Sequence, residues 1–271
     1  MLNLALVAAE EPSPFLQLIE HLSPHHYAGW PVWKIGGVDL SPTNAVVNIW
    51  LASFICIAVF WVAASRPRLV PKGLQNSIEV AMDFVKDNIV YSVMNLKDGK
   101  TWFPFIGTTF FFIFFMNSVG LIPYIGFTPT SNIWVTAALA VGIYLMAVAI
   151  GMARHGVFTF WKKSLVPPDV PKALLILMVP IELVSQLARP FSLAVRLFAN
   201  MLADHVILLI FVGFIFLVGS SLAFGHFIII PIAMLMEVIF TAFAIFVAFI
   251  QAVIFAFLTT IYINDALHPG H

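Results

Sequence analysis

The feature that most constrains this chain is a pair of very long apolar stretches in its second half, residues 173–219 and 226–264. As straight helices they would be about 70 Å and about 58 Å long, whereas the hydrocarbon core of a bilayer is about 30 Å thick. Either each stretch is broken into shorter helices, with Pro180 and Pro190 as kinks, or both lie steeply tilted as an antiparallel hairpin. No basic loop interrupts either stretch, so we expect the tilted hairpin. Such a hairpin has a wide lateral surface, which suggests a partner packed along it.

The composition excludes an ordinary soluble protein. Of the 271 residues, 61% are hydrophobic and only 10% are charged, whereas soluble domains carry about 25% charge. A soluble chain of this length could not bury so many apolar side chains, and a disordered chain would not contain them. The apolar runs are also too long and unbroken for a membrane β-barrel. We therefore expect an all-α polytopic membrane protein with about five membrane helices.

Charge and motifs exclude several activities. The 13 basic and 13 acidic residues give a net charge of zero, so no basic excess indicates nucleic-acid binding. The single cysteine, Cys56, lies inside an apolar run, which argues against disulfides and thiol catalysis. A Gly-x4-Gly-Lys-Ser/Thr motif is absent from the sequence, so we expect no nucleotide bound by this chain. We also expect no cofactor and no metal.

The first half of the chain predicts three spans and one helix on the membrane surface. Basic residues follow the first span and are nearly absent before it, which indicates that the N-terminus lies outside. Residues 1–9 lack a basic region, so a cleaved signal peptide is the less favoured alternative. The predicted divisions are an external N-terminal segment (1–44), a membrane domain (45–265) and a tail (266–271). The membrane domain comprises a first span (45–64), an interfacial amphipathic helix (73–95), a helical hairpin (103–153, with spans 103–122 and 132–153) and the tilted hairpin (173–265).

A polar stripe centred on Arg196 runs along the stretch 173–219. Arginine at the centre of a membrane helix costs about 2.5–3.5 kcal/mol on insertion scales. No carboxylate lies three or four residues from Arg196, so its partner is water, Glu237 on the next stretch, or another chain. At 100° per residue, the stripe within about 40° of Arg196 comprises Glu182, Ser185, Arg189, Ser192 and Asn200.

Each polar residue also has a purely structural alternative. Arg196 could pair with Glu237 and so join the last two helices. Arg189 could extend to the lipid headgroups, and Gln251 could form a simple hydrogen bond between helices. For the two serines the alternative is a hydrogen bond to the carbonyl four residues earlier, at Ser185 and Ser192.

The sequence SLAVRLFANM at residues 192–201 resembles the signature of the a subunit of F-type ATP synthases. That signature is a small apolar run, then Arg, Leu-Phe, a small residue and Asn. Three further motifs agree in order: GLIPY at 120–124, FIQA at 249–252 and YIND at 262–265. The resemblance covers roughly residues 40–265. It implies a proton-translocating stator subunit of a rotary ATP synthase, a multi-pass protein of the bacterial plasma (inner) membrane or, less favoured, of an organellar inner membrane.

The resemblance also implies a role for each polar position. Arg196 would face the carboxylate of the rotating c-ring and separate two aqueous half-channels. The inlet half-channel, from outside, would be lined by Asn200, Asp204, His205, Glu237 and Gln251. The outlet half-channel, to the cytoplasm, would be lined by Glu182, Ser185, Arg189 and Ser192. The implied partners are the c-ring proteolipid subunits, the b-type subunits of the peripheral stalk and membrane lipids.

One position departs from the family pattern. Many members carry an ionisable group seven residues before Gln251, but here that residue is Ala244. Glu237 lies on the same helix face, roughly 10 Å further along the axis. We expect it to relay the proton instead, in an outer cluster with Asp204 and His205. The structural alternative is that Glu237 pairs with His205 only for packing.

The alternative function is a stand-alone ion channel or secondary transporter gated by an arginine. Such a protein would show broken helices in a repeated pattern, and we find no internal repeat. A purely structural membrane anchor would not explain the polar stripe. If the hairpin instead lies along a rotor, the neighbours Leu193 and Leu197 are expected to contact a proteolipid subunit.

Overall fold

The computed structural model describes residues 34–35, 38–39, 42–65, 67–122, 128–166, 172–219 and 225–269. Two short strands, β1 (Lys34–Ile35) and β2 (Val38–Asp39), pair antiparallel with Lys34 opposite Asp39. All other regular elements described are helical. They are α2 (Asn44–Ala64), α3 (Leu74–Phe84), a π-helix (Val85–Val90), α4 (Tyr91–Val93), α5 (Leu96–Val119), a 3₁₀ turn (Pro129–Ser131), α6 (Ile133–His155), α7 (Val157–Leu165), α8 (Lys172–Gly219) and α9 (Gly225–Leu267).

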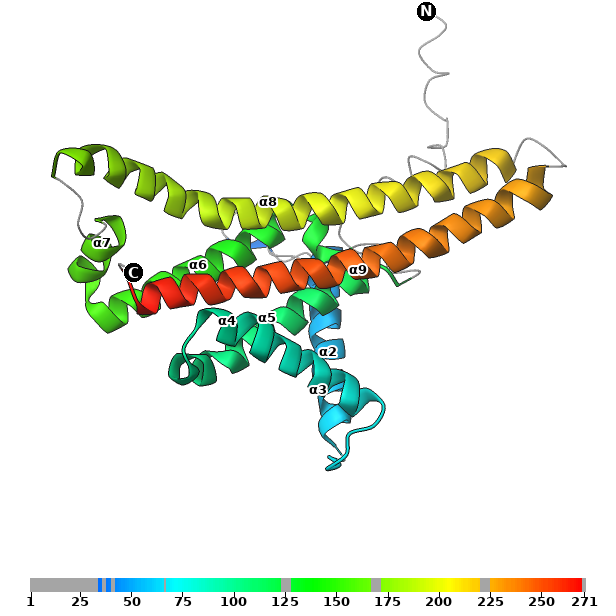
Figure 1. Cartoon of the computed structure of the whole chain (residues 1–271). Coiled ribbons are helices and arrows are strands. Elements are labelled where there is room, and N and C mark those ends of the chain that lie inside the picture. The colour runs from blue at the N-terminus through cyan, green and yellow to red at the C-terminus, as the bar shows by residue number, and fades with distance from the viewer. Residues whose placement is uncertain are drawn as a thin grey trace, which may run out of the picture.

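The two long apolar stretches are two uninterrupted helices, of 48 residues in α8 and 43 in α9. They run antiparallel and side by side across the width of the molecule, at a large angle to α2 (Figure 1). Pro180 and Pro190 lie within α8 without breaking it. The prediction of a long helical hairpin is therefore confirmed. At about 1.5 Å per residue each helix exceeds the thickness of a bilayer core, so both must incline steeply to remain within one.

In the described part of the chain, five helices are long and apolar enough to cross a membrane, as the sequence predicts. The second of them begins seven residues before the predicted boundary at 103. The reason is a helix cap, since the side-chain oxygen of Asn95 accepts hydrogen bonds from the backbone N–H groups of Lys97 and Asp98. The five candidate spans are Asn44–Ala64, Leu96–Val119, Ile133–His155, Leu174–Asp204 and Pro231–Leu267.

The amphipathic segment predicted at 73–95 is helical from Leu74 to Val93, through α3, the π-helix and α4. Glu79 and Asp83 are exposed, whereas Val85 and Ile89 are buried. One face therefore packs against the protein and the other is free for water, as the periodicity predicts.

Helix α7 was not among the predicted elements, since its nine residues are too few to span a membrane. It is held by Phe160, which is 5% exposed and packs directly on Gly151 of α6. A Cβ at position 151 would overlap the Phe160 ring. The chain turns at Gly156, whose φ of +80° favours glycine, and the contact of Phe160 with Gly151 packs α7 against α6.

The core lies where α9 crosses α5 and α6. Every fourth residue of α9 from position 244 to 256 is a buried alanine, which allows neighbouring helices to approach closely. Phe110 of α5 packs edge to face on Phe249 of α9, with ring centroids 5.8 Å apart. Helix α8 packs on α9 and α6 at the side of this core.

The contact between α6 and α7 gives a direct test of the packing. We expect Gly151→Ala to destabilise the chain by about 1–3 kcal/mol, because the buried Phe160 ring must move. Gly142→Ala on the same helix is the matched control, since nothing lies within 4 Å of its Cβ position. Thermal denaturation of the purified chain in detergent measures the difference. Equal stability of the two variants would contradict the packing described.

Candidate functional site

Arg196 lies in the middle of α8 with its side chain exposed. In the part of the chain that the structure describes, no hydrogen bond or ion pair joins Arg196 to another residue. Glu237, the partner that the structural alternative requires, is half-buried and does not pair with it. The charge of Arg196 is therefore presented outward and not used to join α8 to α9.

The residues beside Arg196 divide into a buried and an exposed side. Leu193 and Leu197 are 2% and 1% exposed and belong to the core. The expectation that these two leucines contact an outside partner is therefore wrong for this structure. The reason is their direction: they lie 60–100° round the helix from Arg196, on the side that packs against the core.

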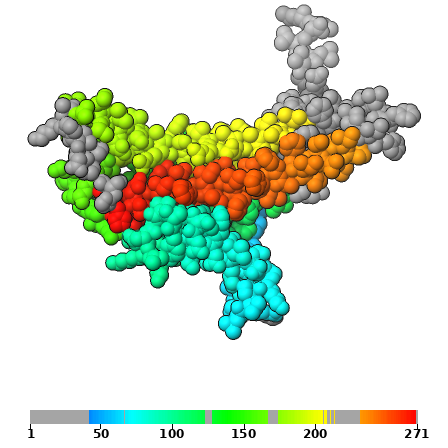
Figure 2. Space-filling view, in the orientation of Figure 1, coloured from blue at the N-terminus to red at the C-terminus, as the bar shows by residue number. Residues whose placement is uncertain are grey.

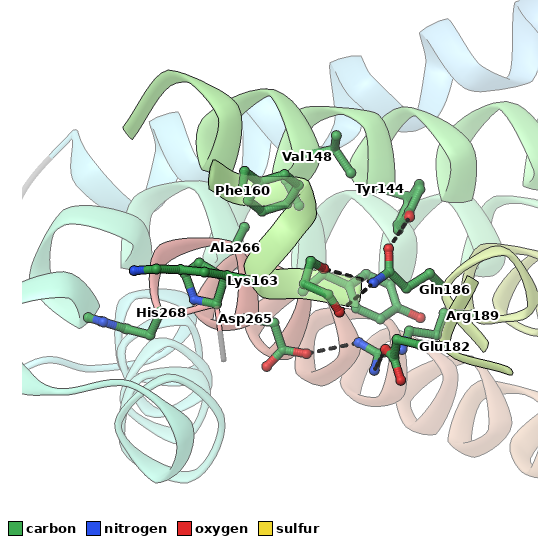
Figure 3. A pocket seen from close by; sticks show the side chains of 14 residues that line it. Tyr144, Val148, Phe160, Lys163, Glu182, Gln186, Arg189, Asp265, Ala266 and His268 are labelled. Atoms are coloured by element: carbon green, nitrogen blue, oxygen red, sulfur yellow. Dashed lines mark hydrogen bonds and ion pairs between the residues drawn. The ribbon is translucent and has the colours of Figure 1, made fainter. Parts of the chain in front are cut away.

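Seven residues earlier, Arg189 is held between two carboxylates. Its Nη1 donates a hydrogen bond to Oδ2 of Asp265 at 2.8 Å, and its Nη2 lies 3.9 Å from Oε1 of Glu182 (Figure 3). Arg189 is thus paired within the protein, which differs from the alternative that it reaches the lipid headgroups. Asp265 comes from the end of α9, so this pairing joins the two helices of the hairpin.

These three residues border a cavity of about 300 Å³ at the end of the hairpin, where α6, α7, α8 and α9 meet. Hydroxyl, amide and charged groups face it together with aromatic rings (Figure 3). A pocket of this size and polarity accommodates several water molecules. Its lining residues that carry polar side chains are Tyr144, Lys163, Ser164, Glu182, Gln186, Arg189, Tyr262, Asp265 and His268.

Gln186 is a buried residue in the wall of this pocket, and sequence reasoning did not identify it. Its Nε2 donates to the hydroxyl and the carbonyl of Ser164 at 2.7 and 3.3 Å, and its Oε1 accepts from the Tyr144 hydroxyl at 3.5 Å. It thereby connects α8 to α6 and α7. A signal was present in the sequence, because Gln186 lies one turn from both Glu182 and Arg189 at the edge of the polar stripe.

Tyr262 of α9 is a further polar residue of the pocket. Its side chain is buried and lines the cavity. Its ring lies edge to face with Tyr144 at a centroid distance of 6.3 Å. The two tyrosines therefore form one aromatic contact in the wall of the cavity, between α6 and α9.

The other predicted residues of the stripe are not fully buried. Ser185 is half-buried and Ser192 is exposed. Among the described residues, neither hydroxyl forms the alternative hydrogen bond to the backbone carbonyl four residues earlier. Asn200 is half-buried. No cluster of three or more His, Cys, Asp or Glu that could hold a metal lies in the described ranges.

On the other side of Arg196, the predicted inlet residues are partly described. Asp204 is half-buried, and its Oδ2 is fully enclosed with no hydrogen-bond partner. Gln251 and Ala244 are buried on α9, and Glu237 is half-buried. The side chain of His205 lies outside the described residues, so the cluster of Asp204, His205 and Glu237 remains a prediction.

The sequence of the chain is similar to those of known proteins of one family. The family described as "ATP synthase A chain" matches residues 46–264. ATP synthase subunit a of Rhodospirillum rubrum is 42% identical over 235 residues, which cover 87% of this chain and 92% of that protein. The corresponding subunit of Magnetococcus marinus is 40% identical over 267 residues, covering 97% and 98%, and that of Hyphomonas neptunium is 41% identical over 243 residues, covering 88% and 92%. The chain therefore belongs to the family of ATP synthase a subunits, the membrane-embedded, proton-translocating subunits of the stator.

Proposed function

We propose that Arg196 is the charge that separates two aqueous half-channels and that it faces a carboxylate of the c-ring. The observation that carries this proposal is the exposed guanidinium in the middle of α8, which no described residue of the chain neutralises. Facing lipid would cost several kcal/mol. A carboxylate on a partner that moves past Arg196 removes that cost and gives the charge a function.

The surface around Arg196 suits a close helical partner. Four small residues are exposed on one side of it: Ala188, Ser192, Ala199 and Ala203. Small side chains let the backbone of a second helix approach closely in a membrane. The space-filling view in Figure 2 shows α8 and α9 lying side by side across the molecule, and many of their exposed side chains are large and apolar. Only 11% of the residues in the most apolar segment of α8 are buried, compared with 44% in α5. Much of the hairpin surface is therefore free to contact a partner.

Proton transfer through the site then follows from the charge of Arg196. A proton that arrives from outside neutralises a rotor carboxylate, which can leave Arg196 and turn into the apolar bilayer. When a protonated carboxylate returns to Arg196, the fixed positive charge favours the ionised form and the proton leaves. Arginine does not lose its own proton, so it also blocks direct leakage between the half-channels. Each proton that crosses 100 mV releases about 2.3 kcal/mol.

The outlet half-channel is supported by the pocket at the end of the hairpin. Glu182, Arg189 and Tyr262 border it. Ser185 and Ser192 lie on the same helix face as Glu182 and supply hydroxyls between the pocket and Arg196. We assign the outlet half-channel to this group.

The inlet half-channel is supported by the polar groups on the other side of Arg196. Asn200, Asp204 and His205 come from α8, whereas Glu237 and Gln251 come from α9. The enclosed Oδ2 of Asp204 has no hydrogen-bond partner, and an unpaired buried carboxylate oxygen is costly unless it exchanges protons or contacts water. Because position 244 carries only a methyl group, we assign the relay step to Glu237.

The remaining parts of the proposal are the setting and the other subunits. The relatives reported above are bacterial, which supports the bacterial plasma membrane as the location. Membership of the family implies assembly with other ATP synthase subunits. We assign the exposed hairpin to the c-ring, and we propose b-type stalk subunits and membrane lipids as further partners.

The central residue can be tested in vesicles that contain the complete complex. We expect Arg196→Ala and Arg196→Gln to abolish ATP synthesis driven by a proton gradient, with assembly largely retained because the side chain is exposed. Arg196→Lys is expected to perform poorly, since lysine can lose its charge when it is desolvated. Coupled synthesis in Arg196→Ala vesicles would disprove the mechanism.

The relay role of Glu237 makes a second prediction. We expect Glu237→Gln to reduce passive proton flux and ATP synthesis strongly, and the added change Ala244→Glu to restore part of both. The exposed carboxylate of Glu79 on α3 offers a matched control, because Glu79→Gln removes the same charge away from the hairpin. Near-normal synthesis in Glu237→Gln would mean that the proton enters by another route.

A further inference from the structure

We infer that Asp265 is a positioning residue for proton release: its carboxylate draws the guanidinium of Arg189 away from Glu182 and so leaves Glu182 available to a departing proton. This inference rests on the proposed outlet half-channel. It gives a role to a carboxylate at the end of α9 that the polar stripe of α8 does not include.

The geometry of Arg189 is asymmetric. The distance from Nη1 to Asp265 is 2.8 Å, a charge-assisted hydrogen bond, whereas the distance from Nη2 to Glu182 is 3.9 Å, beyond hydrogen-bond range. The two contacts use different nitrogens of one planar guanidinium. Its preference for Asp265 thus determines how closely it approaches Glu182.

Without the charge of Asp265, Glu182 is the nearest described carboxylate to Arg189. The two residues lie two helical turns apart on one face of α8, and a shift of roughly 1 Å would bring them into hydrogen-bond range. A carboxylate bound in that way is a poor acceptor for a passing proton, because the proton must displace a charge-assisted hydrogen bond. The negative charge at position 265 prevents this.

The end of α9 is anchored without Asp265. His268 Nε2 lies 2.9 Å from Asp98 Oδ2, and the other oxygen of that carboxylate, Oδ1, lies 3.7 Å from Nη1 of Arg154. His155 Nε2 lies 2.9 Å from the carbonyl oxygen of Leu267. These contacts join the end of α9 to α5 and α6. They hold the backbone near Asp265 in place without any contribution from its side chain.

The exposure of the Arg189–Asp265 pair also argues against a mainly stabilising role. The side chain of Asp265 is 50% exposed and that of Arg189 is 36% exposed. Ion pairs exposed to this degree contribute little to stability. The other charged or titratable groups that face the pocket are Lys163, His268, Tyr144 and Tyr262.

The test compares variants of the complete complex in vesicles, with passive proton conduction and ATP synthesis as readouts. We expect Asp265→Asn to lower both by about tenfold, the effect of one charge-assisted hydrogen bond, and Asp265→Glu to retain most of the activity. The decisive variant is Asp265→Asn combined with Arg189→Gln. Because it removes the guanidinium that would bind Glu182, it is expected to conduct several-fold faster than Asp265→Asn alone.

A purely structural pair predicts a different pattern. If Asp265 only joined α9 to α8, the double variant would conduct no faster than Asp265→Asn, and that result would overturn the inference. Unchanged rates in Asp265→Asn, or loss of assembly in this variant, would overturn it as well. Asp83→Asn on α3, an exposed aspartate outside the pocket, is the control and is expected to behave like the unmodified chain.

Two further variants separate this inference from the proposed function. Arg196→Ala and Glu182→Gln are measured in the same vesicles. If Arg196→Ala retains coupled synthesis, the half-channel proposal itself fails, and if Glu182→Gln alone retains it, the proposed outlet fails. If both lose it while Asp265→Asn keeps normal rates, the half-channels stand and only the role of Asp265 is refuted.

Discussion

A permanent positive charge in the middle of an apolar helix is the constraint on which the rest of this structure depends. The insertion cost of about 2.5–3.5 kcal/mol must be offset by a partner, and the described residues provide none for Arg196. The long hairpin, the small exposed residues beside the arginine and the apolar surface around them all suit the rotor partner that we propose. In that proposal they present one charge to a rotor carboxylate that approaches Arg196 and then moves away.

Two arginines on one helix illustrate how position decides function. Arg189 lies at the end of the hairpin between Asp265 and Glu182, so its charge is compensated within the protein and borders a polar pocket. Arg196, two turns further along α8, pairs with no carboxylate among the residues that the structure describes. In the proposed mechanism, Arg189 therefore belongs to the outlet for protons, and Arg196 remains available to a carboxylate from another chain.

Sequence reasoning recovered those features that depend on local periodicity. The hairpin, the membrane spans and the polar stripe follow from apolar length and from the 100° turn of a helix, and the structure has the two long helices and the spans. Features that depend on contacts between distant segments were missed. The pairing of Arg189 with Asp265 and the hydrogen bonds of Gln186 join different helices, the cap at Asn95 sets the start of α5, and the burial of Leu193 depends on what α8 packs against.

The most direct test of the account is which face of α8 meets the rotor. Cysteines replacing Ser192 and Ala199, in a Cys56→Ala background of the complete complex, are predicted to form crosslinks to a proteolipid subunit, because both positions are exposed beside Arg196. Cysteines replacing the buried Leu193 and Leu197 are predicted to form none. Crosslinks from the leucine positions alone, or from none of the four, would contradict the claim that Arg196 faces a rotor carboxylate.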